Sequence, residues 1–350
     1  MIEPRLSLAE LKAQVAVASG ASVRAAVHAQ IVALHERSTR DQKPYFDFEL
    51  GDGATTLRFK IWNNHAFFAR CGELQDGQFI EAVGEFTDSG KFGPEFRTLQ
   101  CRELNDLERE ELLLGSIDRR ERLAADFDDV VAKFASIADP RLRGLCELFV
   151  QKFEARFRRA AAARNYHHAR RGGLLEHVAQ MFRAADALCG VYPHLNRDLV
   201  LAGVLFHDCG KLWECCPAEN GFAIEPTETG ELLGHISMGI ELVNRLWHEM
   251  RENGALAGWE DLTPKSDHVR QHLLHLIASH HGEMQFGSPV LPKTPEAMLL
   301  HFIDNIDARL EMLAGSYTGS TELAPGVFER VAPLSQNAVR PLPKHSPNPD

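Results

Sequence analysis

The sequence predicts a multidomain α and β protein in which a small β-barrel or sandwich is followed by an all-helical domain. Between about residues 22 and 103, short runs alternate apolar and polar side chains and are separated by glycine-containing turns. This is the pattern of half-buried strands. After about residue 104, apolar residues recur at helical spacing in long segments that continue to about residue 316.

Four alternating runs carry the strand prediction. Residues 45–50 and 56–62 alternate on either side of a glycine-rich turn, so they predict a hairpin. Residues 78–86 and 95–102 predict a second pair of strands joined by a turn, because glycines and a proline lie between them. The segment 22–36 satisfies both the helical and the strand period, so periodicity leaves its structure open.

The helical half starts with the acidic stretch 105–111, which suits the N-terminus of a helix. Apolar spacing then predicts five further helices in the region that carries most of the histidines. They run through residues 174–182, 198–207, 230–247, 267–280 and 295–313. The tail from about residue 333 is rich in proline and lacks a core-forming pattern, so we expect it to be disordered.

The charge of the chain argues against a protein that is coated in basic surface. The 350 residues carry a formal net charge of -11, whereas many nucleic-acid-binding proteins are basic. The charge is nevertheless uneven, because residues 141–171 hold nine basic and two acidic side chains. This stretch predicts either a region that attracts phosphate or a solvated helix face.

Cysteine usage and hydropathy favour a cytoplasmic protein without a membrane partner. The seven cysteines form an odd set without the paired spacing of a zinc knuckle, so we expect reduced thiols in a reducing compartment. No apolar run approaches the roughly 20 residues of a membrane-spanning helix. The N-terminus also lacks a basic flank that leads into a hydrophobic stretch.

Histidines concentrate in the helical half, where 13 of the 17 lie between residues 167 and 301. Such clustering favours a metal site. The dipeptide His207-Asp208 follows an apolar helix and precedes Cys209-Gly210-Lys211, so it lies where a buried helix ends. An adjacent imidazole and carboxylate can serve one ion together, and the second carboxylate oxygen can bridge to another ion.

Five further groups lie on other predicted helices or at their ends, as a metal site in the core of a helical bundle requires. They are His177, His235, His280, His281 and Asp304. Each of them alone would more often be a core residue or a helix cap. Their order, however, is His, His-Asp, His, His-His and Asp, which resembles the metal-binding pattern of the HD superfamily of phosphohydrolases.

The residues around these groups resemble one family within that superfamily, the bacterial YhaM family of 3′-to-5′ exoribonucleases. The similar segments are residues 167–177 (HHARRGGLLEH), 206–211 (FHDCGK), 230–236 (GELLGHI), 279–282 (SHHG), 287–289 (GSP) and 296–307 (EAMLLHFIDNID). Residues 43–53 and 59–62 are similar to the first hairpin of the OB-fold that this family carries before its HD domain. The resemblance covers roughly residues 22 to 315.

The resemblance implies a domain order and makes segment 22–36 the first strand of an OB-type β-barrel. We therefore expect five consecutive regions: an N-terminal extension (1–21), an OB-fold (22–104), a helical connector (105–160), an all-α HD-type domain (161–316) and a tail (317–350). The implied activity is metal-dependent 3′-to-5′ hydrolysis of single-stranded RNA, with single-stranded DNA as a further candidate substrate.

The resemblance also implies roles for the site residues. One or two divalent transition-metal ions would be held by His177, His207, His235, a histidine of the pair His280 and His281, and Asp304, with Asp208 bridging. Lys211 could offer charge to a phosphoryl oxygen, or it could be a solvated lysine after a helix end. His167 and His168 could donate to phosphate or to the leaving oxygen, or they could pair with backbone in a structural role. Manganese is the favoured ion, although iron, cobalt, nickel and zinc also suit these ligands.

Nucleic acid would be held by aromatic stacking and by phosphate attraction. The candidates are Phe46, Phe48 and Trp62 in the barrel, and Arg164, Arg170 and Arg171 in the basic stretch. Alternation turns some of the barrel rings inward, and a ring on a barrel strand is more often part of the core. Residues 29–103 nevertheless contain nine basic and twelve acidic side chains. This balance lowers the affinity for nucleic acid that we expect of the barrel. The chain could also form a homo-oligomer.

Two alternatives stay open. The chain could be an HD phosphohydrolase of small nucleotides or cyclic dinucleotides, although it lacks a Gly-Tyr-Pro motif near the third ligand. It could also be a non-catalytic RNA or protein interaction module that keeps a metal site for structure. The complete set of candidate ligands argues against that last reading.

Overall fold

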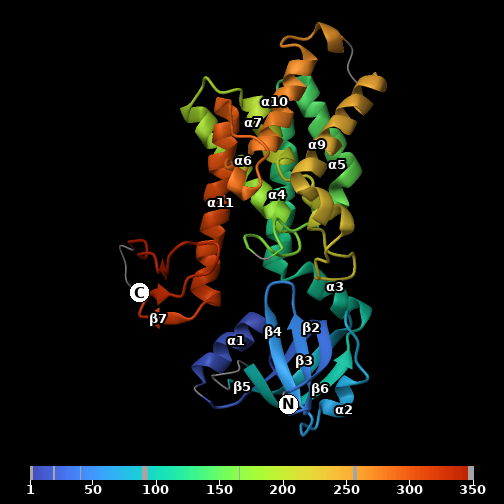
Figure 1. The fold of residues 1–350 in the computed structure, drawn as a ribbon, viewed down its shortest axis with the longest axis vertical. Helices are drawn as coiled ribbons and strands as arrows, with labels where there is room; N and C mark the ends of the chain where they lie inside the picture. Colours follow the sequence, from blue (N-terminus) through green and yellow to red (C-terminus); the bar gives the residue numbers. More distant parts are fainter. Residues whose placement is uncertain are drawn as a thin grey trace. The chain divides into compact units, whose positions relative to one another are not determined.

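The structure is a computed structural model that describes residues 3–18, 20–39, 41–88, 94–164, 166–254 and 258–345, without the side chains of residues 260, 318 and 319. The chain divides into two compact units (Figure 1). The β unit consists of Met1–Arg122 and Pro217–Glu225. The helical unit consists of Leu123–Cys216 and Pro226–Asp350.

An antiparallel sheet with strand order β4-β3-β2-β5-β6 forms the β unit, and the short strand β1 runs parallel to β2. The six strands are β1 (Arg5–Leu6), β2 (Val23–Ser38), β3 (Pro44–Gly51), β4 (Thr56–Trp62), β5 (Phe79–Asp88) and β6 (Pro94–Glu103). Three helices accompany them: α1 (Leu8–Val17), α2 (Phe68–Cys71) and α3 (Asp106–Leu114). The sheet therefore confirms both predicted hairpins and shows that segment 22–36 is a strand. The turn between β5 and β6 lies outside the described residues.

The long strand β2 explains how the sheet curls into an OB-like barrel. It pairs with β5 through its first half and with β3 through its second half, and its register shifts between Ile31 and Ala33. Such a bulge bends a strand and increases its twist. The rings of Phe59 on β4 and Phe96 on β6 lie 5.2 Å apart in the core. The two ends of the sheet therefore meet across a shared set of buried rings.

Two segments outside the predicted barrel belong to the β unit. Helix α1 begins with a capping box at Ser7 and buries Leu8 and Leu11 in the core of the unit, so the expected N-terminal extension is part of this fold. Residues 217–225 also belong to it, because the backbone N–H of Phe222 donates to the Gln30 side chain at 3.0 Å. The expected HD domain is therefore interrupted by this segment.

A bundle of helices forms the second unit. Its helices are α4 (Ile117–Ala135, which begins in the β unit), α5 (Pro140–Phe157), α6 (Gly173–Val191), α7 (Arg197–Phe206), α8 (Lys211–Glu214), α9 (Glu228–Glu252), α10 (Ser266–Ser279) and α11 (Pro295–Gly319), with short 3-10 turns η1 (Trp259–Asp261) and η2 (Met284–Phe286). All five helices predicted from apolar spacing are present. The expected connector is not separate, because α5 and most of α4 pack into the same core.

Helix α7 is the centre of this bundle. It packs against α5, α6, α10 and α11, and every residue from Leu199 to Phe206 is buried. A helix that is apolar on all sides is stable only when neighbours cover it completely. The end of α7 therefore delivers the next two residues, His207 and Asp208, into the interior of the bundle.

The C-terminal region contains more structure than its composition predicts. Strands β7 (Glu322–Ala324), β8 (Val327–Phe328) and β9 (Ala338–Val339) form a small antiparallel sheet. Strand β9 lies within the tail that we expected to be disordered, and Ala338 is buried there. Among the described residues, no helix is both long and apolar enough to cross a membrane. All seven cysteines are free.

Candidate metal centre

His207 and Asp208 occupy the buried end of α7, with exposed fractions of 0% and 2%. The ring of His207 is fixed by its Nδ1, which donates to the Val204 carbonyl oxygen at 2.8 Å. A carbonyl oxygen can only accept, so the other nitrogen, Nε2, carries a lone pair when the ring is neutral. This lone pair points into the space between α6, α9, α10 and α11, where the remaining candidate ligands meet.

A first ion position lies among His177, His207, Asp208 and Asp304. His177 comes from α6 and Asp304 from α11. The Nε2 atoms of His177 and His207 lie 3.2 Å apart, and Asp304 Oδ1 lies 3.4 Å from His177 Nε2. Asp208 Oδ2 lies 3.3 Å from His207 Nε2. Nitrogen and oxygen donors at these separations can share one cation.

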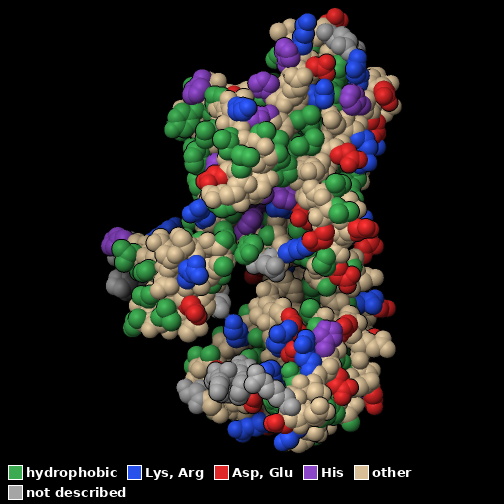
Figure 2. Space-filling model, in the orientation of Figure 1, with side chains coloured by type: hydrophobic (Ala, Val, Ile, Leu, Met, Phe, Trp, Pro, Cys, Tyr) green, Lys and Arg blue, Asp and Glu red, His purple; other side chains and the backbone are tan. Residues whose placement is uncertain are grey.

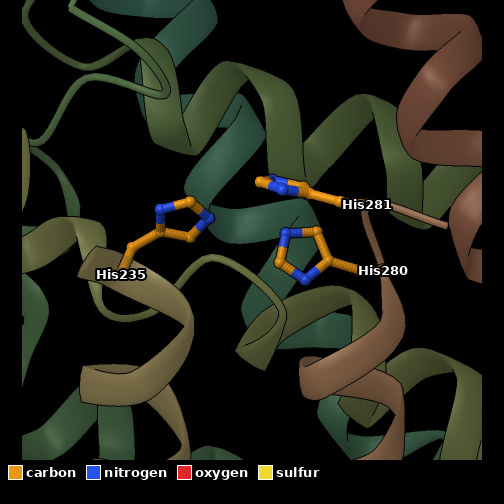
Figure 3. A group of neighbouring side chains, drawn as sticks. All are labelled: His235, His280 and His281. Atoms are coloured by element: carbon orange, nitrogen blue, oxygen red, sulfur yellow. The ribbon is translucent and has the colours of Figure 1, made fainter. Parts of the chain in front are cut away.

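A second ion position lies among His235, His280, His281 and Asp208. His235 comes from α9, and His280 and His281 follow the end of α10. Figure 3 shows the three rings gathered around one space, and each offers a nitrogen within 4.8 Å of the others. Asp208 Oδ1 lies 3.4 Å from His235 Nε2 and 3.5 Å from His280 Nε2. Both members of the histidine pair therefore lie at the same position.

Asp208 is shared by the two positions. Its Oδ2 faces His207 and its Oδ1 faces His235 and His280, which is the arrangement of a bridging carboxylate. Buried atoms without a hydrogen-bond partner include Asp208 Oδ1, His235 Nε2 and His280 Nε2. Leaving each such atom unpaired costs about 1–3 kcal/mol. Each of these three atoms can donate an electron pair, and both ring nitrogens face the same carboxylate oxygen. A divalent metal ion between them would satisfy all three.

The charges around the centre also favour cations. Burial raises the pKa of Asp208, but Lys211 and His207 outweigh this effect and hold it well below its usual range. Burial likewise acts against Asp304, whose pKa is lowered by its hydrogen bond with His177 and by nearby histidines. Both carboxylates are therefore ionised at neutral pH and can act as ligands.

Burial keeps the histidines of the second ion position neutral. It lowers the pKa of His235 and of His280, and it is the largest of the effects that lower the pKa of His281 to about 4. His280 Nδ1 donates to the Ile277 carbonyl oxygen at 2.8 Å, and His281 Nδ1 donates to that of Phe286 at 2.7 Å. Their Nε2 atoms therefore keep the lone pairs that metal binding needs.

Lys211 and His167, two of the predicted substrate-contacting residues, lie beside the centre. Lys211 is 6% exposed, and its Nζ lies 2.7 Å from Asp208 Oδ2. The ring of His167 lies 5.5 Å from that of His177. Burial, followed by the charges of Lys211 and His177, lowers the pKa of His167 to about 3, so the ring is neutral. Within the described part of the chain, its ring nitrogens have no hydrogen-bond partner.

His168 is placed differently from the prediction. It is 1% exposed and adopts a positive φ of 46°. Its Nε2 lies 2.9 Å from Asp307 Oδ2, and its Nδ1 lies 3.4 Å from Glu176 Oε2. Gly173 packs so closely on this residue that a Cβ there would lie 2.0 Å from the His168 carbonyl oxygen. Both ring nitrogens are thus engaged inside the protein, and this geometry disagrees with the predicted donation to substrate.

Acids from the same region and from distant elements neutralise much of the basic stretch 141–171. Arg141 is 2% exposed and pairs with Asp139. Lys152 pairs with Glu249, Arg158 with Glu154, Arg164 with Glu231, and Arg170 with Glu176 and Glu311. Arg164 differs from the others, because its Nε and Nη2 are buried without a partner. The sequence count therefore overstates the free positive charge of this region.

Only one of the three predicted barrel aromatics is at the surface. Phe48 is 0% exposed in the core, and Phe46 is half-buried against Phe68, so alternation turns both inward. Trp62 is 39% exposed and pairs across the sheet with Tyr45, whose ring lies 5.1 Å away. Tyr45 was missed, although it alternates with Phe46 and so had to face outward. In Figure 2, basic and acidic side chains are interspersed on the visible face of the β unit.

Two carboxylates behind the ligands complete the centre. Glu214 accepts from His235, and Asp307 accepts from His177. Asp307 lies one helical turn from Asp304 on α11, so helical spacing points to it, whereas no pattern in the sequence points to Glu214.

Comparison with known proteins agrees with this geometry. Residues 174–309 match the HD domain family. The chain is 29% identical over 304 residues to 3′-5′ exoribonuclease YhaM of Oceanobacillus iheyensis, which covers 86% of this chain and 88% of that protein. It is 36% identical over 187 residues to the Bacillus subtilis protein of the same name, covering 53% and 54% of the two chains. A Geobacillus relative with that name is 27% identical over 304 residues, covering 85% of each chain. The chain is therefore an HD-domain protein and a homologue of the YhaM exoribonucleases.

Proposed function

We propose that this protein is a metal-dependent 3′-to-5′ exoribonuclease that hydrolyses the phosphodiester bonds of single-stranded RNA. The observation that carries the proposal is the pair of ion positions that share Asp208, with orphaned buried atoms of Asp208, His235 and His280 facing one another. The homologues named 3′-5′ exoribonuclease supply the direction and the substrate class.

Seven side chains would hold the metal: His177, His207, Asp208 and Asp304 at the first ion position, and His235, His280 and His281 with Asp208 at the second. Divalent ions held in this way lower the pKa of a coordinated water and neutralise charge on a phosphoryl group. The chemistry of the ligands, which combines imidazoles with carboxylates, suits manganese, the ion we favour, and also iron, cobalt, nickel and zinc.

Two side chains are proposed to act on the substrate itself. Lys211 supplies a fixed positive charge at the edge of the centre, where it would balance the charge that develops on a phosphoryl oxygen. His167 is neutral, and its ring nitrogens pair with no other residue that the structure describes, so it would donate one hydrogen bond to the phosphate or to the leaving oxygen. His168 is not assigned to the substrate, because its ring is enclosed.

Trp62 with Tyr45 and Arg164 are our candidates for RNA contacts. Trp62 offers an exposed ring on β4 beside the half-buried ring of Tyr45 on β3. Arg164 has two buried guanidinium nitrogens that no described residue pairs. Arg171 stays a predicted phosphate contact, whereas Phe46, Phe48 and Arg170 are engaged within the fold. Single-stranded DNA as a second substrate, a cytoplasmic location and self-association remain predictions.

A time course on RNA labelled at its 5′ end tests the proposal. The chelator-treated protein is supplied with manganese, and the products are separated by length. Stepwise shortening from the 3′ end supports the proposed function, with Asp208→Asn as the inactive control. Intact RNA together with rapid hydrolysis of a small nucleotide or cyclic dinucleotide would favour the other HD phosphohydrolase activity. Bound but uncleaved RNA in the metal-loaded protein would favour a non-catalytic module.

A further inference from the structure

We infer that Asp307 and Glu214 are positioning residues, and that each carboxylate orients one histidine ligand for one of the two ion positions. Asp307 serves the first ion position through His177, and Glu214 serves the second through His235. This inference rests on the proposed metal centre, but it concerns residues behind the ligands and is tested separately from the activity.

The ring of His177 lies between two carboxylates of one helix. Asp304 and Asp307 are three residues apart on α11, so they lie on the same side of that helix. Asp304 Oδ1 lies 3.4 Å from His177 Nε2, whereas Asp307 Oδ2 lies 2.7 Å from His177 Nδ1. Asp307 therefore accepts the Nδ1 proton and leaves Nε2 to face the first ion position. Without it, the ring could rotate or carry its proton on Nε2.

His168 holds Asp307 in place from the other side. Its Nε2 lies 2.9 Å from the same Oδ2 atom that accepts from His177. The far side of the His168 ring faces Glu176, and Arg170 ties Glu176 to Glu311 on α11. A carboxylate that contacts two imidazoles has little freedom to rotate. His168 therefore acts on the metal centre through Asp307.

Glu214 holds both the backbone and the ring of His235. Its Oε2 accepts from the His235 backbone N–H at 2.9 Å and from Nδ1 at 2.8 Å. The preceding residue, Gly234, has a φ of 66°, a conformation that breaks α9 and frees this N–H from the helix. On the other side, Gly210 packs against the His235 backbone so closely that a Cβ would lie 2.0 Å from its carbonyl oxygen. His235 is therefore fixed at three points, and Nε2 is directed at Asp208.

The other three histidines are oriented differently. His207, His280 and His281 donate their Nδ1 protons to the backbone carbonyl oxygens of Val204, Ile277 and Phe286. A substitution cannot remove these acceptors. Asp307 and Glu214 are thus the two side chains through which the tautomer of one ligand at each position can be changed without removing a ligand. Loss of such a partner typically lowers metal affinity 10–100-fold.

A crossed pair of isosteric substitutions tests the inference. Manganese is titrated calorimetrically into chelator-treated full-length protein carrying Asp307→Asn or Glu214→Gln, and into each variant combined with His177→Ala or His281→Ala. In the His281→Ala background only the first ion position remains, and we expect Asp307→Asn to lower its manganese affinity by roughly 10–100-fold. In the His177→Ala background only the second ion position remains, and Asp307→Asn should leave its manganese affinity unchanged. Glu214→Gln should show the opposite pattern.

Two further variants keep the test decisive if an isosteric variant fails to fold. Asp307→Glu retains the charge and should recover part of the lost affinity. His168→Gln removes one of the two contacts that hold Asp307. It should lower the manganese affinity of the first ion position without raising the KM for RNA. An increase in KM with unchanged manganese affinity would instead place His168 on the substrate and overturn the network.

The possible failures are distinguishable. If the unmodified protein binds neither manganese nor iron, cobalt, nickel or zinc, the proposed function fails. If it binds two ions and neither isosteric substitution changes either affinity, the inference fails and the proposed function stands. If each substitution weakens both ions equally, the separate assignment of one carboxylate to one position is wrong.

Discussion

Replacing Asp208 with asparagine removes one negative charge from both ion positions while keeping the size of the side chain. Asp208 is 2% exposed and lies 3.3–3.5 Å from nitrogens of His207, His235 and His280. A ligand that binds only the folded protein stabilises it by about 2.7 kcal/mol at a hundredfold excess over its Kd. Two ions should therefore add about 5 kcal/mol, and asparagine at the shared position should remove most of that gain.

The assay is thermal unfolding of the chelator-treated protein, followed by circular dichroism with and without manganese. For a unit of 150–250 residues, each kcal/mol shifts Tm by about 2–4 °C, so the unmodified protein should gain roughly 10–20 °C. We expect Asp208→Asn to gain less than about 5 °C and to lose RNA hydrolysis by at least on the order of 10³-fold. Asp267→Asn is the matched control, because this carboxylate on α10 is 71% exposed and should leave both values unchanged. A full manganese-induced shift in Asp208→Asn would refute the bridging assignment.

Four further predictions concern the surface and the fold. Trp62→Ala should weaken binding of a single-stranded RNA by about 1–3 kcal/mol, measured by fluorescence anisotropy, and unchanged binding would remove this ring from the RNA contacts. Arg164→Gln should raise the KM for RNA about tenfold, equivalent to about 1.4 kcal/mol, while the manganese affinity stays the same; a changed manganese affinity would contradict a phosphate role. Arg141→Met should lower the free energy of unfolding by about 3–5 kcal/mol, because it leaves Asp139 without its buried partner, and urea unfolding measures this loss. Burial acts to raise the pKa of Asp139, but Arg141 outweighs it and lowers the pKa; the stability that this pair adds is therefore present above about pH 4 and should decline as the pH falls further. Asp139→Asn should lack this acid-dependent component.

The sequence was most informative where local pattern and chemistry coincide. Alternation placed the strands, and the apolar run before His207-Asp208 located the buried helix end, because a strand or helix must present its apolar side chains to the core. The order of histidines and aspartates along the chain then singled out groups that lie close together in the structure. Segment 22–36 was the exception, since its periodicity allowed two structures and only the resemblance favoured a strand.

Features that depend on distant partners were not predictable in this way. The basic stretch allowed either a phosphate-attracting region or a solvated helix face, but acids far along the chain, such as Glu249 and Glu311, neutralise some of its side chains. The position of His168 before the ligand motif left a substrate contact and a structural role open, and only the packed bundle shows that its partner is Asp307. Glu214 carries no recognisable motif, and its role arises from the break in α9 before His235. Such roles are set by tertiary packing and not by spacing along the chain.

Diffraction from crystals of the manganese-loaded protein, recorded at the manganese absorption edge, would locate the ions themselves. We predict two anomalous peaks in each chain, one among His177, His207 and Asp304 and the other among His235, His280 and His281, with Asp208 contacting both. Loaded crystals without a peak in this region, or with peaks that Asp208 does not touch, would contradict the two-ion centre.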